Sequence, residues 1–193
     1  MITVSEKPRP LAKKAERKAI SLDTFKSRYL PKTTFKYEWK NGRVEKEEFA
    51  KAAERYMINN VTTKFSTSSV YQEGCRMMGE VDCYLSTVNA DRRPDAAYLS
   101  PAQINFPETA AEAPVLVIEV SSPSHSGGQN IAKMPEYFKA GNQVVWYIYP
   151  DRRQVWVYTD PETVTICRKG DLCSADPAIP EFSVRVDEIF SSK

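Results

Sequence analysis

Two acidic residues stand in apolar surroundings where a folded chain has little structural use for a charge. Asp95 precedes the apolar segment 96–99, and Glu119 lies inside the aliphatic run 115–120. Burying a lone carboxylate costs on the order of several kcal/mol unless it is paired, protonated or bound to a metal ion. A segment that carries Lys133 follows. Two carboxylates and a lysine in this order indicate a divalent-metal site for phosphodiester hydrolysis.

The chemistry explains why these residue types would be needed. A phosphodiester is anionic, so an enzyme that hydrolyses it must hold a cation, activate a water molecule and neutralise charge on the phosphate. Mg²⁺ prefers hard oxygen ligands and keeps several waters, so two carboxylates suffice. We therefore expect Asp95 and Glu119 to hold Mg²⁺ or Mn²⁺, without a small-molecule cofactor. In other interpretations Asp95 caps backbone amides at a turn, and Lys133 is a solvated side chain on a helix.

The composition describes a folded domain. A chain of 193 residues is long enough for one α/β or α+β domain with a real core, and 41% hydrophobic residues can fill it. No apolar run approaches the ~20 residues that span a bilayer, and the N-terminus lacks the apolar stretch of a signal peptide. We expect a cytoplasmic protein with no membrane partner.

Cysteine and histidine are too few and too scattered for a structural zinc site. The only histidine is His125, and no two cysteines have the spacing of a CxxC pair. We expect reduced and mostly buried thiols at Cys75, Cys83, Cys167 and Cys173. His125 could serve a Ser-His-Asp triad with Asp95 and either Ser121 or Ser122, but the chain has no Gly-x-Ser-x-Gly elbow.

The charge distribution suggests an N-terminal arm. The net charge is only +2, yet six basic residues lie within the first eighteen. Such a block can contact phosphates or remain a solvated tail. We expect a basic flexible arm at residues 1–20 and a single domain at 21–193.

Local patterns in the first third of the chain predict a helix, a hairpin and a second helix. Ser21 is a typical N-cap for a helix that ends near residue 29. Asn41-Gly42 between two alternating runs, 35–40 and 43–46, indicates a β-hairpin. Residues 47–59 have helical character, with an apolar stripe formed by Phe49, Ala52, Ala53, Tyr56 and Met57.

The rest of the chain alternates predicted strands with one helix. We expect two or three strands in 69–99, further strands at 115–120, 144–149, 153–158 and 163–167, a helix at 131–140 and a helical turn at 187–190. Five of the six residues in 115–120 are apolar, which is typical of a central strand covered on both faces. The predicted fold is α/β (α+β), with a mixed β-sheet flanked by helices and the two carboxylates on adjacent strands.

Five short motifs, taken together and in this order, resemble the PD-(D/E)XK nuclease superfamily. They are Tyr37-Glu38 followed by Gly42, Arg93-Pro94-Asp95, Ile118-Glu119-Val120 followed by Ser122-Pro123, Lys133 with Tyr137 and Gly141, and Val145-Trp146 with Ile148 and Pro150. More narrowly, the chain is similar to the putative restriction endonuclease domain family, from about residue 37 to residue 190. The resemblance implies a restriction-endonuclease-like core.

The resemblance also implies roles for individual residues. Asp95 and Glu119 would hold the metal ion, with the carbonyl of Val120 as a candidate third ligand. Lys133 would assist the reaction, and Glu38 would orient a water molecule or a neighbouring group. In another interpretation Glu38 is a cross-strand partner of a residue such as Arg43.

The sequence departs from the superfamily pattern at two positions. The lysine expected two residues after the glutamate is replaced by Ser121, so that Lys133 would have to substitute for it from the following helix. Pro135, inside that predicted helix, removes a backbone hydrogen bond and could turn Lys133 away from the site.

These features together predict a metal-dependent endonuclease that acts on DNA. The alternative is a catalytically degenerate module that keeps the fold and binds nucleic acid or protein; Ser121, Pro135 and the low net charge motivate it. A homodimer would supply the two sites that cutting both strands needs.

Overall fold

The computed structural model describes residues 18–49, 51–105, 113–121 and 127–191. Most of the predicted basic arm, and the His125 of the Ser-His-Asp alternative, therefore lie outside the described residues. Within the described part of the chain, no helix is long and apolar enough to cross a membrane.

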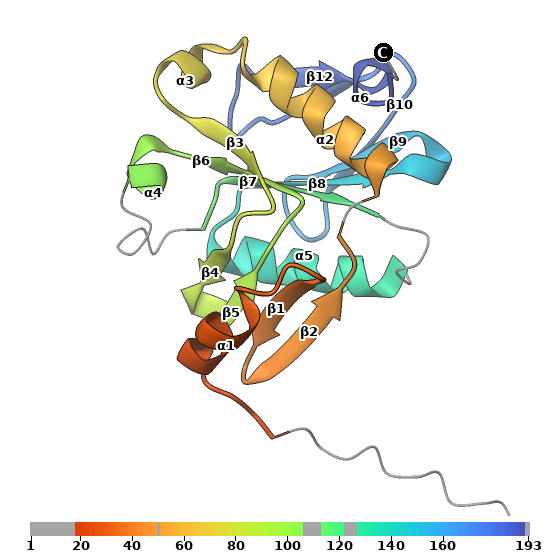
Figure 1. Cartoon of the computed structure of the whole chain (residues 1–193). Coiled ribbons are helices and arrows are strands. Elements are labelled where there is room, and N and C mark those ends of the chain that lie inside the picture. The colour runs from red at the N-terminus through yellow and green to blue at the C-terminus, as the bar shows by residue number, and fades with distance from the viewer. Residues whose placement is uncertain (1–17, 50, 106–112, 122–126, 192–193) are drawn as a thin grey trace, which may run out of the picture.

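A six-stranded mixed sheet forms the centre of the molecule (Figure 1). In spatial order its strands are β10 (Val164–Arg168), β9 (Gln154–Tyr158), β8 (Val144–Tyr149), β7 (Leu116–Val120), β6 (Ala96–Leu99) and β3 (Arg76–Gly79). Only β7 and β8 run parallel; the other neighbours are antiparallel. The predicted mixed sheet flanked by helices is confirmed.

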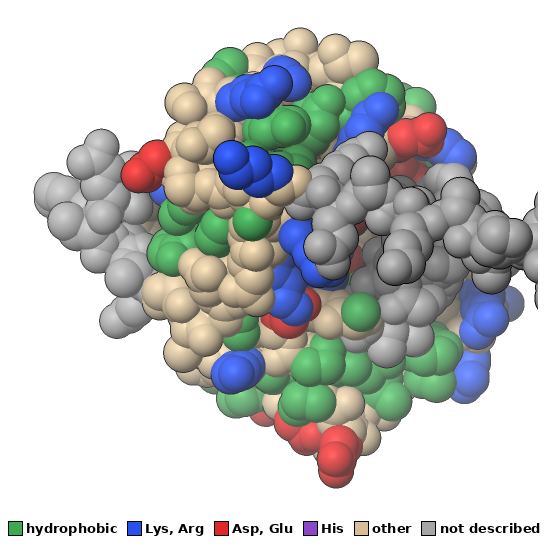
Figure 2. Space-filling view, turned by 90° about the horizontal axis from the view of Figure 1, so that it is seen from below, with side chains coloured by type: hydrophobic (Ala, Val, Ile, Leu, Met, Phe, Trp, Pro, Cys, Tyr) green, Lys and Arg blue, Asp and Glu red, His purple; other side chains and the backbone are tan. Residues whose placement is uncertain are grey.

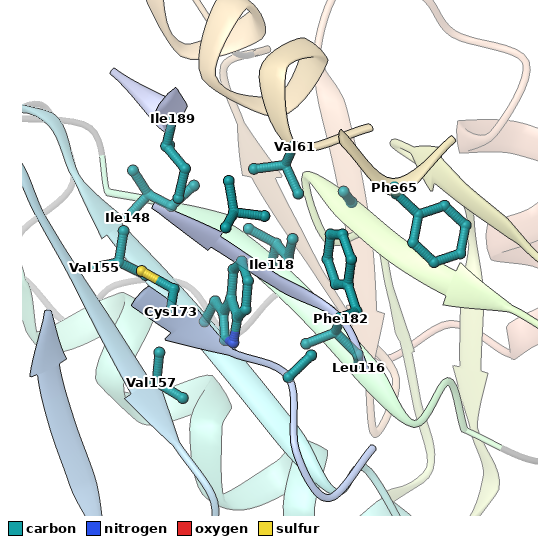
Figure 3. Close-up of a cluster of buried hydrophobic side chains, with 14 of the residues drawn as sticks. Val61, Phe65, Leu116, Ile118, Ile148, Val155, Val157, Cys173, Phe182 and Ile189 are labelled. Carbon is teal, nitrogen blue, oxygen red and sulfur yellow. The ribbon is translucent and has the colours of Figure 1, made fainter. Parts of the chain in front are cut away.

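Both faces of β7 are covered, as predicted, and this decides where its side chains go. All five of its residues are buried. Leu116 and Ile118 point into a core shared with Val61 and Phe65 of α2 (Ala52–Phe65), as Figure 3 shows. Since side chains alternate along a strand, Val117 and Glu119 point to the opposite face. That face is covered by α5 (Gly127–Ala140).

Three further elements complete the first of these two cores. They are β11 (Leu172–Ser174) and β12 (Ser183–Arg185), which form a two-stranded sheet, and α6 (Val186–Ile189). Cys173, Phe182 and Ile189 reach from this region into the same core (Figure 3). Short helices at α3 (Ser69–Gln72) and α4 (Pro101–Asn105) and 3₁₀ turns at Ser86–Val88 and Pro150–Arg152 connect the strands.

A second, four-stranded antiparallel sheet lies below α5 in Figure 1. Its order is β2 (Arg43–Glu47), β1 (Lys36–Lys40), β5 (Ala90–Arg92) and β4 (Cys83–Leu85). The predicted Asn41-Gly42 turn joins β1 to β2, with positive φ at both residues. Ala19 packs directly on Gly42, and the backbone N–H of Ile20 donates to the Gly42 carbonyl at 2.9 Å.

Two predicted helices are confirmed. Helix α1 (Leu22–Tyr29) begins after Ser21, whose hydroxyl accepts a hydrogen bond from the Thr24 amide. Helix α5 links the parallel strands β7 and β8 and ends at Gly141, which has a φ of +109°. It continues across Pro135. The four cysteines are free and buried.

The helix predicted at 47–59 is wrong in its bounds and in its buried face. Glu47 pairs with Lys36 as the last residue of β2, and α2 begins at Ala52. Tyr56 is 59% exposed, whereas Val61 and Phe65 are the buried apolar residues of the helix. The strand continues through Glu47 because the hairpin pairs it with Lys36. In α2, the residues that pack on the six-stranded sheet lie further along the chain than the predicted apolar stripe. Likewise, residues 69–99 contain four strands rather than two or three.

Candidate metal site and nucleic-acid interface

Asp95 lies where the chain crosses from the small sheet to the large one, between β5 and β6. Its Oδ2 accepts a hydrogen bond of 2.7 Å from the Val120 backbone N–H, and its Oδ1 accepts one of 3.1 Å from Lys36 Nζ. The pairing of Ala96 with Ile118 places Asp95 beside Glu119 on the neighbouring strand. Asp95 therefore caps a backbone amide, as one interpretation held, and also presents a second oxygen to a cation.

Glu119 projects from the middle of the sheet toward α5 and is almost fully buried. The Tyr137 hydroxyl donates to its Oε1 at 2.6 Å, and Lys36 Nζ lies 3.9 Å from its Oε2. Burial raises the pKa of Glu119, Lys36 and Lys133 lower it, and Asp95 raises it again, with a net pKa of about 7. Its ionised form is thus poorly compensated by the protein alone.

Lys36 is the residue of this site that the sequence analysis missed. It projects from β1, is 3% exposed, and its ammonium is within 4 Å of the carboxylates of Asp95, Glu119 and Glu47. Burial lowers the pKa of Lys36, but the neighbouring carboxylates raise it by more. The net pKa is above the ordinary value, so the ammonium stays protonated. Its position in an alternating run of charged and aromatic residues made it resemble a solvated strand residue.

Glu38 lies on the same face of β1 and is completely buried. Its Oε2 accepts from Arg92 Nη1 and from Lys133 Nζ, each at 2.9 Å, and its Oε1 accepts from the Arg93 backbone N–H at 3.0 Å. Burial raises the pKa of Glu38, but the three cations Lys133, Lys36 and Arg92 lower it to about 2. Glu38 is thus a cross-strand ion-pair partner, as the alternative interpretation held, but of Arg92 on β5; Arg43 lies opposite Lys40.

Lys133 points from α5 into the site and not into solvent. It is 4% exposed, so the interpretation as a solvated residue is wrong. Its Nζ lies 2.9 Å from Glu38 and 2.7 Å from Glu47. Glu47 therefore contacts both lysines, since Lys36 Nζ lies 3.8 Å from its other oxygen.

The described ion pairs connect these residues into one network. Its ten members are Lys36, Glu38, Lys40, Glu45, Glu47, Arg92, Asp95, Glu119, Lys133 and Glu136. Six of these side chains are carboxylates and four are cations, so the fully ionised network has an excess of two negative charges. A single divalent cation would balance that excess.

The donor set fits Mg²⁺ or Mn²⁺ in its chemistry. Asp95 and Glu119 offer hard carboxylate oxygens, the ligands these ions prefer, and both converge on one cationic atom, Lys36 Nζ. The described residues contain no group of three or more acidic, histidine or cysteine side chains arranged to hold a metal ion. Asp95 and Glu119 are thus the two residues whose oxygens fit such an ion.

An open cavity of about 390 Å³ reaches the site from the surface. Asp95 forms part of its wall, together with Phe49, with Arg55 and Ile58 of α2, with Gly79 at the end of β3, and with Glu80 just after it. A ligand in this cavity would therefore lie next to Asp95, one of the two acidic residues.

Basic side chains also stack on aromatic rings around α1 and the β1–β2 hairpin, at the bottom of Figure 1. Lys32 Nζ lies 4.5 Å from the centre of the Tyr29 ring, and Lys46 Nζ lies 3.3 Å from that of Phe35. Figure 2 views the molecule from this side and shows basic side chains spread among hydrophobic ones.

Comparison with known proteins identifies the family. A family model described as Uma2, putative restriction endonuclease, matches residues 22–187. The chain belongs to the Uma2 family. Among solved structures it is similar to a putative nuclease of the DUF820 group from Anabaena variabilis, with a TM-score of 0.75 and 21% identity over 89% of this chain and 97% of that one. No curated protein matches. The fold expected from the motifs, a mixed sheet flanked by helices, is thus confirmed, and the chain shares it with this putative nuclease.

Proposed function

We propose that this protein is a metal-dependent endonuclease that hydrolyses phosphodiester bonds in DNA. The observation that supports this most directly is the convergence of Asp95 Oδ1 and Glu119 Oε2 on one cation position beside an open cavity. Each carboxylate uses one oxygen for a structural hydrogen bond, to the Val120 amide or the Tyr137 hydroxyl, and directs the other oxygen to the cation position. Glu119, with a pKa of about 7, is the member whose charge the protein leaves least balanced.

The chain's own residues would divide the work. Asp95 and Glu119 hold Mg²⁺ or Mn²⁺, which when bound would neutralise charge on the scissile phosphate and lower the pKa of a water molecule. Tyr137 fixes the orientation of the Glu119 carboxylate through its hydroxyl. Lys133 supplies positive charge from α5, and Glu38 holds Lys133 in place from the opposite side.

The surroundings of the site support DNA as the substrate. Arg55 lines the cavity next to Asp95, where a phosphate would enter. The lysines stacked on Tyr29 and Phe35 place positive charge and aromatic surface on the face near the hairpin, a combination that binds nucleic acids. Cutting both strands requires two sites, and we therefore expect two copies to act together.

Plasmid nicking tests this proposal. Supercoiled plasmid is incubated with Mn²⁺ and either the native protein, Glu119→Ala, or Glu162→Ala, a matched change at an exposed glutamate. We expect nicking by the native protein and by Glu162→Ala, and at least about a 100-fold loss in Glu119→Ala, the scale of removing one group that stabilises the transition state. Equal nicking by all three proteins would refute the assignment of Glu119.

One observation favours a second function, a degenerate module that binds nucleic acid or protein without cutting it. Lys36 already fills the cation position between the two carboxylates, and Ser121 stands where the superfamily has a lysine. Salt-dependent binding of duplex or branched DNA with no cleavage in Mn²⁺ or Mg²⁺ would favour this module over the nuclease.

A further inference from the structure

We infer that the Lys36 ammonium is the resident cation of this site, and that a divalent cation binds between Asp95 and Glu119 only by displacing it toward Glu47. This inference rests on the proposed metal site and adds to it a built-in competitor. It assigns functions to Lys36 and Glu47, which the motifs of the family resemblance do not include.

The position of the ammonium is the first argument. Lys36 Nζ lies 3.1 Å from Asp95 Oδ1 and 3.9 Å from Glu119 Oε2, so it stands where both carboxylates direct their free oxygens. The remaining oxygens of the pair are already used, because Asp95 Oδ2 accepts from Val120 and Glu119 Oε1 accepts from Tyr137. A divalent cation that bridges the two carboxylates would therefore compete with Lys36 for Asp95 Oδ1 and Glu119 Oε2.

Charge is the second argument. An ammonium and a divalent cation repel each other, and the repulsion is strong in a buried site where little water screens it. Both cannot stay close to one carboxylate pair at low cost. Lysine is the residue suited to moving aside, because its charge is a point at the end of a flexible four-carbon chain.

Glu47 is the third argument, because it gives the displaced ammonium a partner. It lies directly opposite Lys36 in the β1–β2 ladder, and its Oε2 is 3.8 Å from Lys36 Nζ. Its other oxygen already binds Lys133 at 2.7 Å. Lys36 can thus turn toward Glu47 without leaving the buried network and without any change in the hairpin.

Mn²⁺ binding to the full chain tests the exchange. Binding is measured by isothermal titration calorimetry and by the electron paramagnetic resonance signal of free Mn²⁺, after circular dichroism has shown that each variant is folded. Lys36→Met removes the charge and keeps the length of the side chain, and Lys36→Gln is a second variant in case the first does not fold. Lys64→Met is the control, since Lys64 lies on α2 and pairs with Glu188, outside the network of the site.

We expect Lys36→Met to bind Mn²⁺ at least about tenfold more tightly than the native protein, or ~1.4 kcal/mol, with Lys36→Gln changed in the same direction and Lys64→Met unchanged. Adding Glu119→Gln to Lys36→Met should abolish the gain. In the native protein labelled with ¹³C-lysine, Mg²⁺ should shift the Cε resonance of Lys36 more than that of Lys40.

The outcomes separate this inference from the proposed function. If the native protein binds Mn²⁺ and folded Lys36→Met binds it no more tightly, the exchange is overturned and the metal site stands. A gain that survives Glu119→Gln also overturns it, because the ion then binds elsewhere. If neither the native protein nor any variant binds Mn²⁺, the metal site itself is wrong. Binding only after Lys36 is removed would mean that Mn²⁺ cannot displace Lys36 in the native protein, which overturns the exchange and favours the degenerate module.

Discussion

The replacement of Glu38 by glutamine tests whether the buried network stabilises the fold. The carboxylate is 0% exposed and accepts hydrogen bonds from Lys133, Arg92 and the Arg93 backbone N–H. Glutamine keeps the size of the side chain and one oxygen, but it removes the charge that these cations face. The change therefore mimics permanent protonation of Glu38.

The magnitude follows from the pKa of Glu38. The value falls from 4.5 to about 2 on folding, and 2.5 units at about 1.36 kcal/mol each give about 3 kcal/mol. Breaking a buried ion pair by removing one partner costs a similar ~3–5 kcal/mol. Since a domain of this size loses roughly 2–4 °C per kcal/mol, we expect Glu38→Gln to lower Tm by about 6–12 °C at pH 7.

The same pKa shift fixes the pH dependence. Because the folded pKa lies below the unfolded one, the stabilisation is fully present above pH 4.5 and disappears as the pH falls through 2. The difference between native protein and Glu38→Gln should shrink to about 1.4 kcal/mol at pH 3. The assay is urea denaturation without metal at both pH values.

The control for this experiment is Glu45→Gln. Glu45 pairs with the same arginine, Arg92, but its side chain is 47% exposed, so we expect a loss below about 1 kcal/mol. If Glu38→Gln and Glu45→Gln lose equal stability at pH 7, or if the Glu38→Gln difference is as large at pH 3, the account of the network is refuted.

Two further predictions concern the sheet and the hairpin. The pKa of Glu119 is raised on folding from 4.5 to about 7, so the unfolding free energy of the metal-free protein should fall by up to about 3 kcal/mol as the pH rises from 4.5 through 7. In urea denaturation, Glu119→Gln should remove this pH dependence. If the unfolding free energies of the native protein and Glu119→Gln change equally with pH, the prediction is contradicted. Gly42→Ala should lower the stability of the fold by at least about 1 kcal/mol, because φ at this position is +84° and the new Cβ would lie 2.7 Å from the Cβ of Ala19. Gly170→Ala is the control, since Gly170 has a φ of +72° but nothing within 4 Å of the new Cβ, and it should lose less stability in thermal unfolding. An equal loss in the two variants would refute the steric clash at Gly42.

The sequence determined the features that depend on neighbouring residues. Ser21 caps a helix because its hydroxyl reaches an amide three residues away. Asn41 and Gly42 form a turn because they tolerate positive φ. The aliphatic run around Glu119 had to be covered on both faces, and alternation along it placed the carboxylate on one of them.

Only the tertiary structure decided which charges meet. Lys36 and Asp95 are 59 residues apart in the sequence. The alternating pattern around Lys36 is typical of a solvent-exposed hairpin strand. It is buried because the small sheet packs its charged face toward α5 and the end of β7, which no local pattern in the hairpin specifies. For the same reason the helix predicted at 47–59 was misplaced. Val61 and Phe65 are its buried apolar residues because they pack on the large sheet, and Glu47 belongs to a strand because it pairs with Lys36. The candidate residues Asp95, Glu119, Lys133 and Glu38 could be predicted from local sequence, whereas the partners they contact depend on long-range packing.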